Sequence, residues 1–337
     1  MELQDLWFIL ISVLFIGFFF LEGFDYGVGI LLPFLGKDDR ERRAIINTIG
    51  PVWDGNEVWM ITAGGAIFAA FPNWYATLFS GFYLALVLIL LALILRGVAF
   101  EFRSKDEHPR WRMIWDRVIF TGSLVPALLW GVAFGNLVKG TPINAAMRFT
   151  GNFFDLLSPY SLLCGLAGLV VFMLHGAIFL SLKTDGTLRE RAEVAAERIW
   201  YPVVVVAALL AVANYVYIDI FNKIGVNPGV MPITSAAALL AVGYFLHEKQ
   251  YGWAFFMMGL TILLSVATFF WFLYPNVMVS STSDAYSLTV HNAAASHKTL
   301  ELMTIVALSF VPIVLLYQGW TYWVFRKRIT ADAKLEY

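Results

Sequence analysis

Acidic side chains within apolar segments are the residues of this sequence that could carry out chemistry. Asp54 and Glu57 stand three positions apart in WDGNEVW and would share one face of a helix. Asp25 lies inside a long apolar run near the N-terminus. A charged group in a membrane helix costs about 2.5–3.5 kcal/mol on the insertion scale, and such groups usually mark a path for protons or ions. These carboxylates are therefore candidate proton or cation carriers.

The composition predicts that transmembrane helices position these acids. The chain has 337 residues, of which 60% are hydrophobic and only 14% charged, and its mean hydropathy is +0.73. A soluble domain has about a quarter of its residues charged. The net charge of −1 gives no reason to expect a nucleic-acid partner. The single cysteine, Cys164, excludes an internal disulfide and a thiolate cluster, and its apolar surroundings indicate a packing role.

Apolar runs of membrane-spanning length recur through the whole chain and predict nine transmembrane helices. The acidic leader MELQD predicts that the first helix is retained rather than cleaved as a signal peptide. Every connection is too short for a separate catalytic domain, which predicts one polytopic membrane domain over residues 1–337. The expected spans are residues 6–35, 52–71, 75–101, 116–138, 158–182, 198–220, 230–247, 252–274 and 301–325.

These spans predict an all-α fold of two four-helix bundles and one peripheral helix. Helices 1–4 would occupy about residues 6–138, helices 5–8 about 158–274, and helix 9 about 301–325. The seventh span is the shortest and could instead be re-entrant, which would change the number of crossings.

The distribution of basic residues predicts the orientation in the membrane. Most of the 23 Lys and Arg residues fall in odd-numbered connections and in the C-terminal tail. The basic residues of the even-numbered connections are only Lys139, Arg148, Lys223 and Lys298. Because cytoplasmic loops carry the excess of positive charge, the N-terminus is expected outside and the C-terminus in the cytoplasm.

This orientation brings five acids and one arginine from four successive helices to the cytoplasmic side: Asp25, Asp54, Glu57, Glu101, Asp116 and Arg96. One interpretation is structural, with Arg96 bonded to one carboxylate and the acids at helix ends kept hydrated. The other is a cytoplasmic entrance for protons or cations, which is the usual role of intramembrane acids. The sequence favours the second interpretation for Asp25 and Asp54, and leaves both open for the other acids.

The histidines give little support for a haem site, although membrane oxidoreductases often bind haem through histidine. Of the five histidines only His175 lies in the middle of a predicted span. One buried histidine cannot make a bis-histidine site; a packing role is favoured over that of a single axial ligand. No spacing matches a zinc site, a Walker loop, a GxGxxG fingerprint or a nucleophile elbow. The residues alone fit a secondary transporter and a bioenergetic-complex subunit about equally.

Several long motifs occur in order along the chain: GFDYGVG, WDGNEVWMITAGGAIFAAFP, RGVAFEFRSK, WDRVIFTGSLVP, GVAFGNL and TGNFF. With them the chain resembles subunit II of cytochrome bd-type quinol oxidases. The resemblance is strongest over residues 1–155 and continues more weakly through YPNVMVSS and YWVFRKRI.

The resemblance implies a bacterial cytoplasmic membrane complex that oxidises ubiquinol or menaquinol and reduces dioxygen to water. It implies a proton gradient built without pumping, because cytoplasmic protons are consumed and quinol protons are released outside. Two b haems and one haem d would lie in the partner, subunit I, which also carries the quinol-oxidising loop. A very small single-helix subunit often accompanies the pair, and a structural quinone in this chain is left open.

The resemblance also ranks the candidate residues. Asp25, Asp54, Arg96 and Asp116 occupy positions that are usually regarded as important in the family. Glu57 is a weaker candidate, because some members have glutamine there, and some have aspartate at the position of Glu101. We therefore expect Asp25 and Asp54 to lead a cytoplasmic proton pathway, with Arg96 as the local counter-charge. The alternatives are a secondary transporter that couples its substrate to protons or sodium, and a purely structural subunit.

Overall fold

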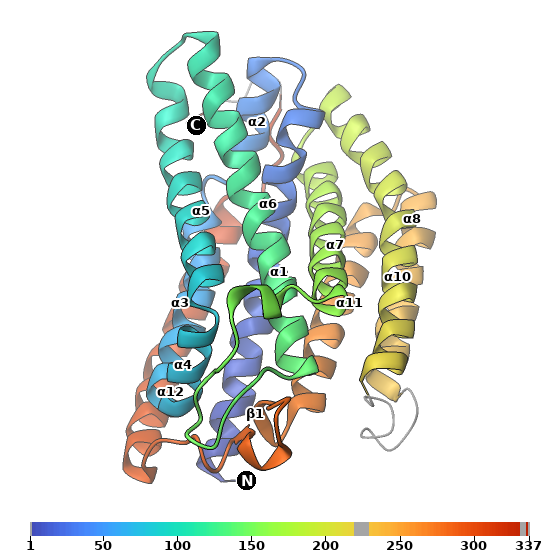
Figure 1. Ribbon diagram of the computed structural model, residues 1–337. Helices are drawn as coiled ribbons and strands as arrows, with labels where there is room; N and C mark the ends of the chain where they lie inside the picture. The colour runs from blue at the N-terminus through green and yellow to red at the C-terminus, as the bar shows by residue number, and fades with distance from the viewer. Residues whose placement is uncertain (1, 219–228, 331–334, 336–337) are drawn as a thin grey trace.

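The computed structural model describes residues 2–218, 229–330 and 335, whose long helices lie side by side along one direction (Figure 1). The described helices are α1 (Leu3–Leu35), α2 (Asp39–Ile49), α3 (Trp53–Ala70), α4 (Pro72–Gly81), α5 (Tyr83–Phe102), α6 (Pro109–Lys139), α7 (Pro159–Lys183), α8 (Gly186–Tyr217), α10 (Val230–His247), α11 (Tyr251–Leu273) and α12 (His297–Val324). Three short 3₁₀ helices lie at Arg103–Lys105, Phe153–Leu156 and Asp284–Tyr286. Two short antiparallel strands, β1 (Asn276–Met278) and β2 (Leu288–Thr289), join α11 to α12.

Eight helices within the described residues are long and apolar enough to cross a membrane. The helix α3 is not one of them, because the polar residues Asp54, Asn56 and Glu57 occupy its first turns. The predicted membrane character of the chain is therefore confirmed, while nine crossings and two four-helix bundles stay predictions. The predicted span 198–220 corresponds to the second half of α8, which ends at Tyr217. Residues 219 and 220 of this prediction lie outside the described part of the chain.

The expected third span, residues 75–101, has the wrong start. Residues 72–81 form the separate helix α4, and α5 begins only at Tyr83. Pro72 at the first position of α4 fits a helix start, since its missing N–H would be unpaired there in any case. Apolar residues continue through both helices, so hydropathy alone could not show the one-residue break at Phe82 between them.

The helix α1 lies at the centre of the fold and packs against α3, α6, α7 and α11. Gly23 and Gly27 stand four positions apart, a spacing that predicts a close helix contact, and the structure confirms it. A Cβ atom on Gly27 would lie 1.9 Å from the carbonyl oxygen of Phe172, and one on Gly176 would lie 2.5 Å from the backbone of Gly27. Small residues on both helices thus let the backbones of α1 and α7 come into contact.

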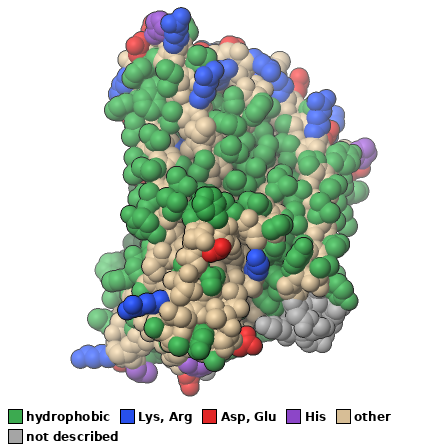
Figure 2. Space-filling model, in the orientation of Figure 1, with side chains coloured by type: hydrophobic (Ala, Val, Ile, Leu, Met, Phe, Trp, Pro, Cys, Tyr) green, Lys and Arg blue, Asp and Glu red, His purple; other side chains and the backbone are tan. Residues whose placement is uncertain are grey.

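The helix α12 lies at the edge of the fold, and only 6% of the residues in its spanning window are buried, against 56% for α6. Its C-terminal end is held near the end of α7, where Lys183 donates to the carbonyl oxygens of Phe325 and Lys327. The start of α1 lies at the opposite end, where Gln4 contacts His291. On the face shown in Figure 2, hydrophobic side chains cover the broad middle and most Lys and Arg lie towards the two ends.

Candidate functional site

Three carboxyl groups and one arginine from three helices meet inside the protein; we call Glu22, Asp25, Glu57 and Arg96 the carboxylate cluster. The guanidinium of Arg96 donates to Glu22, and to Glu57 over 3.3 Å. Glu22, Asp25 and Arg96 are fully buried, whereas the Glu57 side chain is 16% exposed. One positive charge can balance only one of the three carboxylates, so the cluster is suited to hold a variable number of protons.

The surrounding helices hold Arg96 in this place. Gly122 of α6 lies against it, since a Cβ on Gly122 would be 2.8 Å from the Arg96 Cβ atom. The guanidinium also lies over the rings of Tyr26, at 5.0 Å, and Phe100, at 5.5 Å. Such cation–π contacts stabilise a desolvated arginine. A glycine and two rings therefore let a fully charged group sit within an apolar helix bundle.

The cluster keeps buried polar atoms that have no hydrogen-bond partner in the described part of the chain. These atoms are Glu22 Oε2, Asp25 Oδ1, and Nε and Nη2 of Arg96. Buried polar groups are normally paired, and the exceptions often have a functional role. The free carboxyl oxygens are available to take up protons.

A polar chain links Asp25 to α12. Asn56 Nδ2 donates to Asp25 Oδ2 over 2.7 Å, and Asn56 Oδ1 accepts from Tyr322 Oη over 2.7 Å. Gln318 Nε2 lies 3.4 Å from the same Asn56 oxygen, and Gln318 Oε1 accepts from Trp59 Nε1 over 2.9 Å. The four residues Asn56, Trp59, Gln318 and Tyr322 thus connect the carboxylate cluster to the edge helix.

The other three expected path residues do not belong to the cluster. Asp54 and Glu101 have exposed side chains at the ends of α3 and α5. Asp116 is buried but lies in a separate network near α2. The structure therefore brings together Asp25, Glu57 and Arg96 among the expected residues.

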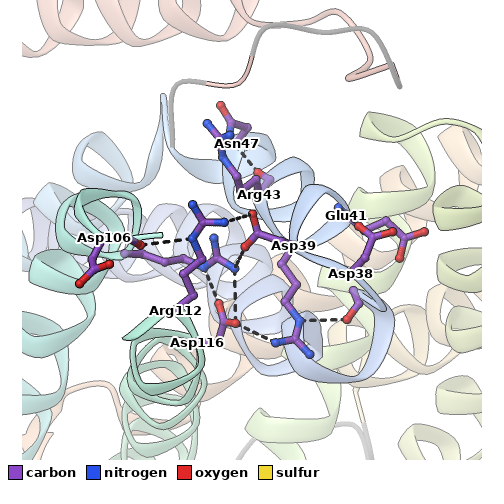
Figure 3. Close-up of polar contacts among 11 residues, drawn as sticks. Asp38, Asp39, Glu41, Arg43, Asn47, Asp106, Arg112 and Asp116 are labelled. Atoms are coloured by element: carbon purple, nitrogen blue, oxygen red, sulfur yellow. Dashed lines mark hydrogen bonds and ion pairs between the residues drawn. The ribbon is translucent and has the colours of Figure 1, made fainter. Parts of the chain in front are cut away.

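The separate network, which we call the α2 network, ties α2 to the nearby ends of α5 and α6 (Figure 3). Asp116 accepts from Arg42 over 2.9 Å and from Arg103 over 2.5 Å. Asp39 accepts from Arg103 over 3.0 Å and from Arg112 over 2.7 Å. Both oxygens of Asp116 are thus engaged by arginines, which leaves neither free for a proton relay.

Through Glu41, the stability of the contact between α2 and α8 is expected to depend on pH. Burial disfavours its charged form, but hydrogen bonds from Arg191 and from the Lys37 backbone N–H outweigh burial and lower the pKa of Glu41. The Arg191–Glu41 ion pair, at 2.5 Å, joins α8 to α2. A carboxyl group with a lowered folded-state pKa contributes stability above its unfolded pKa, and this contribution is lost as the pH falls through the folded value.

Replacing Glu41 with glutamine is therefore expected to lower the melting temperature of the detergent-solubilised protein near neutral pH. The difference from wild type should shrink as the pH is lowered, because the wild-type carboxylate then becomes protonated as well. The same change at Glu190, an exposed glutamate of α8, serves as the control. A difference that stays constant between neutral and acid pH would contradict the assignment.

His175 has the surroundings of a packing residue. It is fully buried, its Nε2 atom lies 3.0 Å from the carbonyl oxygen of Phe20, and its ring stacks on Phe255 with centroids 4.7 Å apart. No group of three His, Cys, Asp or Glu side chains in the described residues could hold a metal ion. The geometry supports the packing role that the sequence favoured.

A cavity of about 530 Å³ lies between α6, α7, α8, α10 and α11. Its walls are mainly apolar, with hydroxyl groups at the Tyr160–Asn214 pair, 2.6 Å apart, and the Ser235–Ser265 pair, 2.9 Å apart. Such walls suit a long apolar molecule that carries a few polar atoms. Phe19 of α1 also lines it, so the lining comes from six helices and could not be predicted from the sequence.

Two polar positions have roles that were not predicted from the sequence. Glu22, the closest partner of Arg96, stands three residues before Asp25, and this spacing was a signal that could have placed it in the cluster. Asn56 lies between two candidate acids and looked like an ordinary polar residue near a helix start. Its partners on α12 are more than 260 positions away.

Comparisons with known proteins agree with this architecture. A family model described as cytochrome bd terminal oxidase subunit II matches residues 3–325. The chain is 45% identical over 336 residues to cytochrome bd ubiquinol oxidase subunit 2 of Bacillus subtilis (strain 168), covering 100% of this chain and 99% of that protein. It is 42% identical over 363 residues to cytochrome bd-I ubiquinol oxidase subunit 2 of Escherichia coli (strain K12), covering 98% and 96%.

The fold is also similar to that of a solved structure, the bd oxidase from Geobacillus thermodenitrificans. The TM-score is 0.79, over 97% of this chain and 100% of that chain, at 16% identity. At this identity the likeness shows the fold alone.

These matches confirm the family resemblance drawn from the sequence motifs. Together with the apolar helices they identify a multi-pass protein of the bacterial cytoplasmic membrane, and a respiratory-chain oxidoreductase subunit. They do not favour a secondary transporter. The chain belongs to the cytochrome bd terminal oxidase subunit II family.

Proposed function

We propose that this chain conducts protons from the cytoplasm to a haem-bearing subunit I, in a complex that oxidises quinol and reduces dioxygen to water. The named relatives are subunits of ubiquinol oxidases, which supports the reaction class. In this proposal the chain also supports the fold of its partner, and the complex builds a proton gradient without pumping. A small single-helix subunit is compatible with the same assembly.

The observation that carries the proposal is the carboxylate cluster. Asp54 is exposed, Glu57 is partly exposed, and Glu22 and Asp25 are fully buried, so the acids form a series of decreasing exposure. Glu57 and Glu22 share Arg96, which offers a common anchor to both carboxylates. Protons would enter at Asp54 and pass through Glu57 to the buried pair. Glu101 would shape the cytoplasmic entrance, while Asp116 would hold α2 in place through its arginine partners.

The uncovered face of α3 and α12 is the proposed contact with subunit I. The α12 side chains Leu308, Phe310 and Leu316 are exposed in the isolated chain. On α3, a Cβ on Gly65 would meet nothing within 4 Å, although small residues usually mark helix contacts. Lipid can cover the apolar side chains of this face. Contact with lipid is unfavourable, however, for the exposed Asp54 and the partly exposed Glu57 of α3. A protein partner would cover both.

Subunit I is also the proposed location of the two b haems and haem d. The contacts of His175 with the Phe20 carbonyl oxygen and the Phe255 ring support a packing role, so no step of the proposal passes through a haem in this chain. The cavity between α6 and α11 would take a structural quinone, whose isoprenoid tail fits apolar walls.

The assembly is tested by purifying the native complex through a tag on this chain. A reduced-minus-oxidised spectrum with b- and d-type haem bands, and a second large chain in the same fraction, is the expected result. A colourless single chain from cells that respire through such an oxidase would overturn the proposal.

The proton path is tested by replacing Asp54 with asparagine. Asparagine cannot carry a proton, so quinol-driven oxygen consumption per haem is expected to fall, while the haem content of the complex stays unchanged. Because Asp54 is exposed, water can partly replace it, and we expect about a tenfold loss or less. Full activity in the Asp54→Asn complex would remove Asp54 from the path. The substitution Glu107→Gln, at an exposed acid beyond α5, is the matched control.

A further inference from the structure

Along the hydrogen bonds that connect Asp25 to α12, one group determines which atoms donate and which accept: the indole N–H of Trp59. The indole N–H of Trp59 can only donate. It lies 2.9 Å from Gln318 Oε1, so this oxygen is the acceptor and the Gln318 amide group must turn its NH₂ towards Asn56. The amide orientation of Gln318 is thus fixed by Trp59.

The orientation of Gln318 in turn fixes the orientation of the Asn56 side-chain amide. Its Oδ1 atom faces the NH₂ of Gln318, at 3.4 Å, and the hydroxyl of Tyr322, at 2.7 Å, and must accept from both. The Asn56 NH₂ group is therefore the one that faces Asp25, 2.7 Å from Oδ2. Asn56 is fully buried, so no solvent competes for its amide.

We propose that Asn56 is a positioning residue for Asp25, and that α12 sets its orientation through Gln318 and Tyr322. Asp25 then always accepts at Oδ2 and exchanges protons at Oδ1, the oxygen with no partner in the described residues. The inference rests on the proposed role of Asp25 as a proton carrier. The helix α12 then has a second role besides packing at the edge of the fold, because Gln318 and Tyr322 orient the donor to Asp25 Oδ2.

The geometry explains how α12 stays in register with α1 and α3 although little of it is buried. At the other end of α12, Trp7 of α1 donates to the Leu300 carbonyl oxygen over 3.2 Å and to Thr304 Oγ1 over 3.1 Å. Trp7 and Trp59 are thus two anchors of one helix, but only Trp59 is connected to Asp25. This difference supplies a matched control.

The test uses the purified complex with Gln318→Met, Tyr322→Phe and Trp59→Phe, each of which removes the hydrogen-bonding group and keeps an apolar side chain of similar or smaller size. The readout is the carboxyl C=O stretching band of Asp25 in infrared difference spectra, identified as the band that the Asp25→Asn complex lacks. We expect this band to shift in all three variants, because Asp25 Oδ2 loses a fixed donor. Trp7→Phe weakens the same helix contact and should leave the band in place.

Two further results separate positioning from simple packing. The double variant Trp59→Phe/Gln318→Met should give the same band as Gln318→Met alone, because Trp59 acts only through Gln318. The pH–activity profile should change in Gln318→Met and Tyr322→Phe and stay as in wild type in Trp7→Phe, because only the first two changes disturb the donor that faces Asp25 Oδ2.

The infrared band tests the positioning role of Asn56, whereas the activity of the Asp25→Asn complex tests the proposed function, so the failure of one can be told from the failure of the other. An Asp25 band that is unchanged in Gln318→Met and Tyr322→Phe, or shifted equally by Trp7→Phe, would overturn the positioning role even if Asp25→Asn is inactive. If Asp25→Asn is fully active, the proton role fails, while the band shifts would still show that α12 positions Asp25.

Discussion

Oxygen consumption by the assembled complex is expected to fall by about 100-fold when Asp25 is replaced with asparagine. Asparagine has nearly the same shape and keeps an oxygen that can accept from Asn56, so the surrounding hydrogen bonds can persist. It cannot bind and release a proton, and Asp25 is fully buried, so solvent cannot take its place. The change also removes one negative charge from a cluster in which three carboxyl groups share one arginine.

The loss of this charge relieves repulsion rather than creating an unpaired charge, so the variant should fold normally. We therefore expect normal yield and a normal haem spectrum together with low quinol-driven turnover per haem. The matched control is Asp116→Asn, which removes another buried aspartate in the α2 network. That variant should be less stable to heat but should keep its turnover. Equal activity losses in both variants would show a general structural effect instead.

The local features of the site could be predicted from the sequence, since each depends on neighbours along one helix. Asp25 stands out because an acid in an apolar run is costly. The pair Gly23 and Gly27 predicts a helix contact from spacing alone, and the backbone of α7 does pack there. The family motifs extend over most of the chain, and the matches confirm them.

The parts that depend on tertiary packing could not be predicted. Gln318 and Tyr322 read as ordinary polar residues near the end of an apolar helix, and only the fold brings them to Asn56. Asp116 looked like a further member of the acid group, but Arg42 of α2 and Arg103, just beyond α5, bind it separately. Charge partners from different helices leave no periodic trace in a sequence.

Replacing Arg96 with leucine is expected to prevent assembly of the complex. Arg96 is fully buried and pairs with Glu22 and Glu57, so the change leaves buried carboxylates without their positive partner. Removing one member of a buried ion pair costs about 3–5 kcal/mol. A loss of this size is a large fraction of the stability of most proteins. The measurement is the amount of haem-containing complex recovered from membranes, relative to wild type.

A double variant decides whether Arg96 acts mainly in folding or in proton transfer. Arg96→Leu/Glu22→Leu removes both members of the closest pair, and such a replacement often recovers stability. If the double variant assembles with its haems but turns over slowly, the pair serves the proton path once the protein has folded. If it assembles and turns over normally, Arg96 and Glu22 only balance each other, and the proton path runs through Glu57 and Asp25 without them. Normal assembly of Arg96→Leu alone would show that the pairing is dispensable for folding.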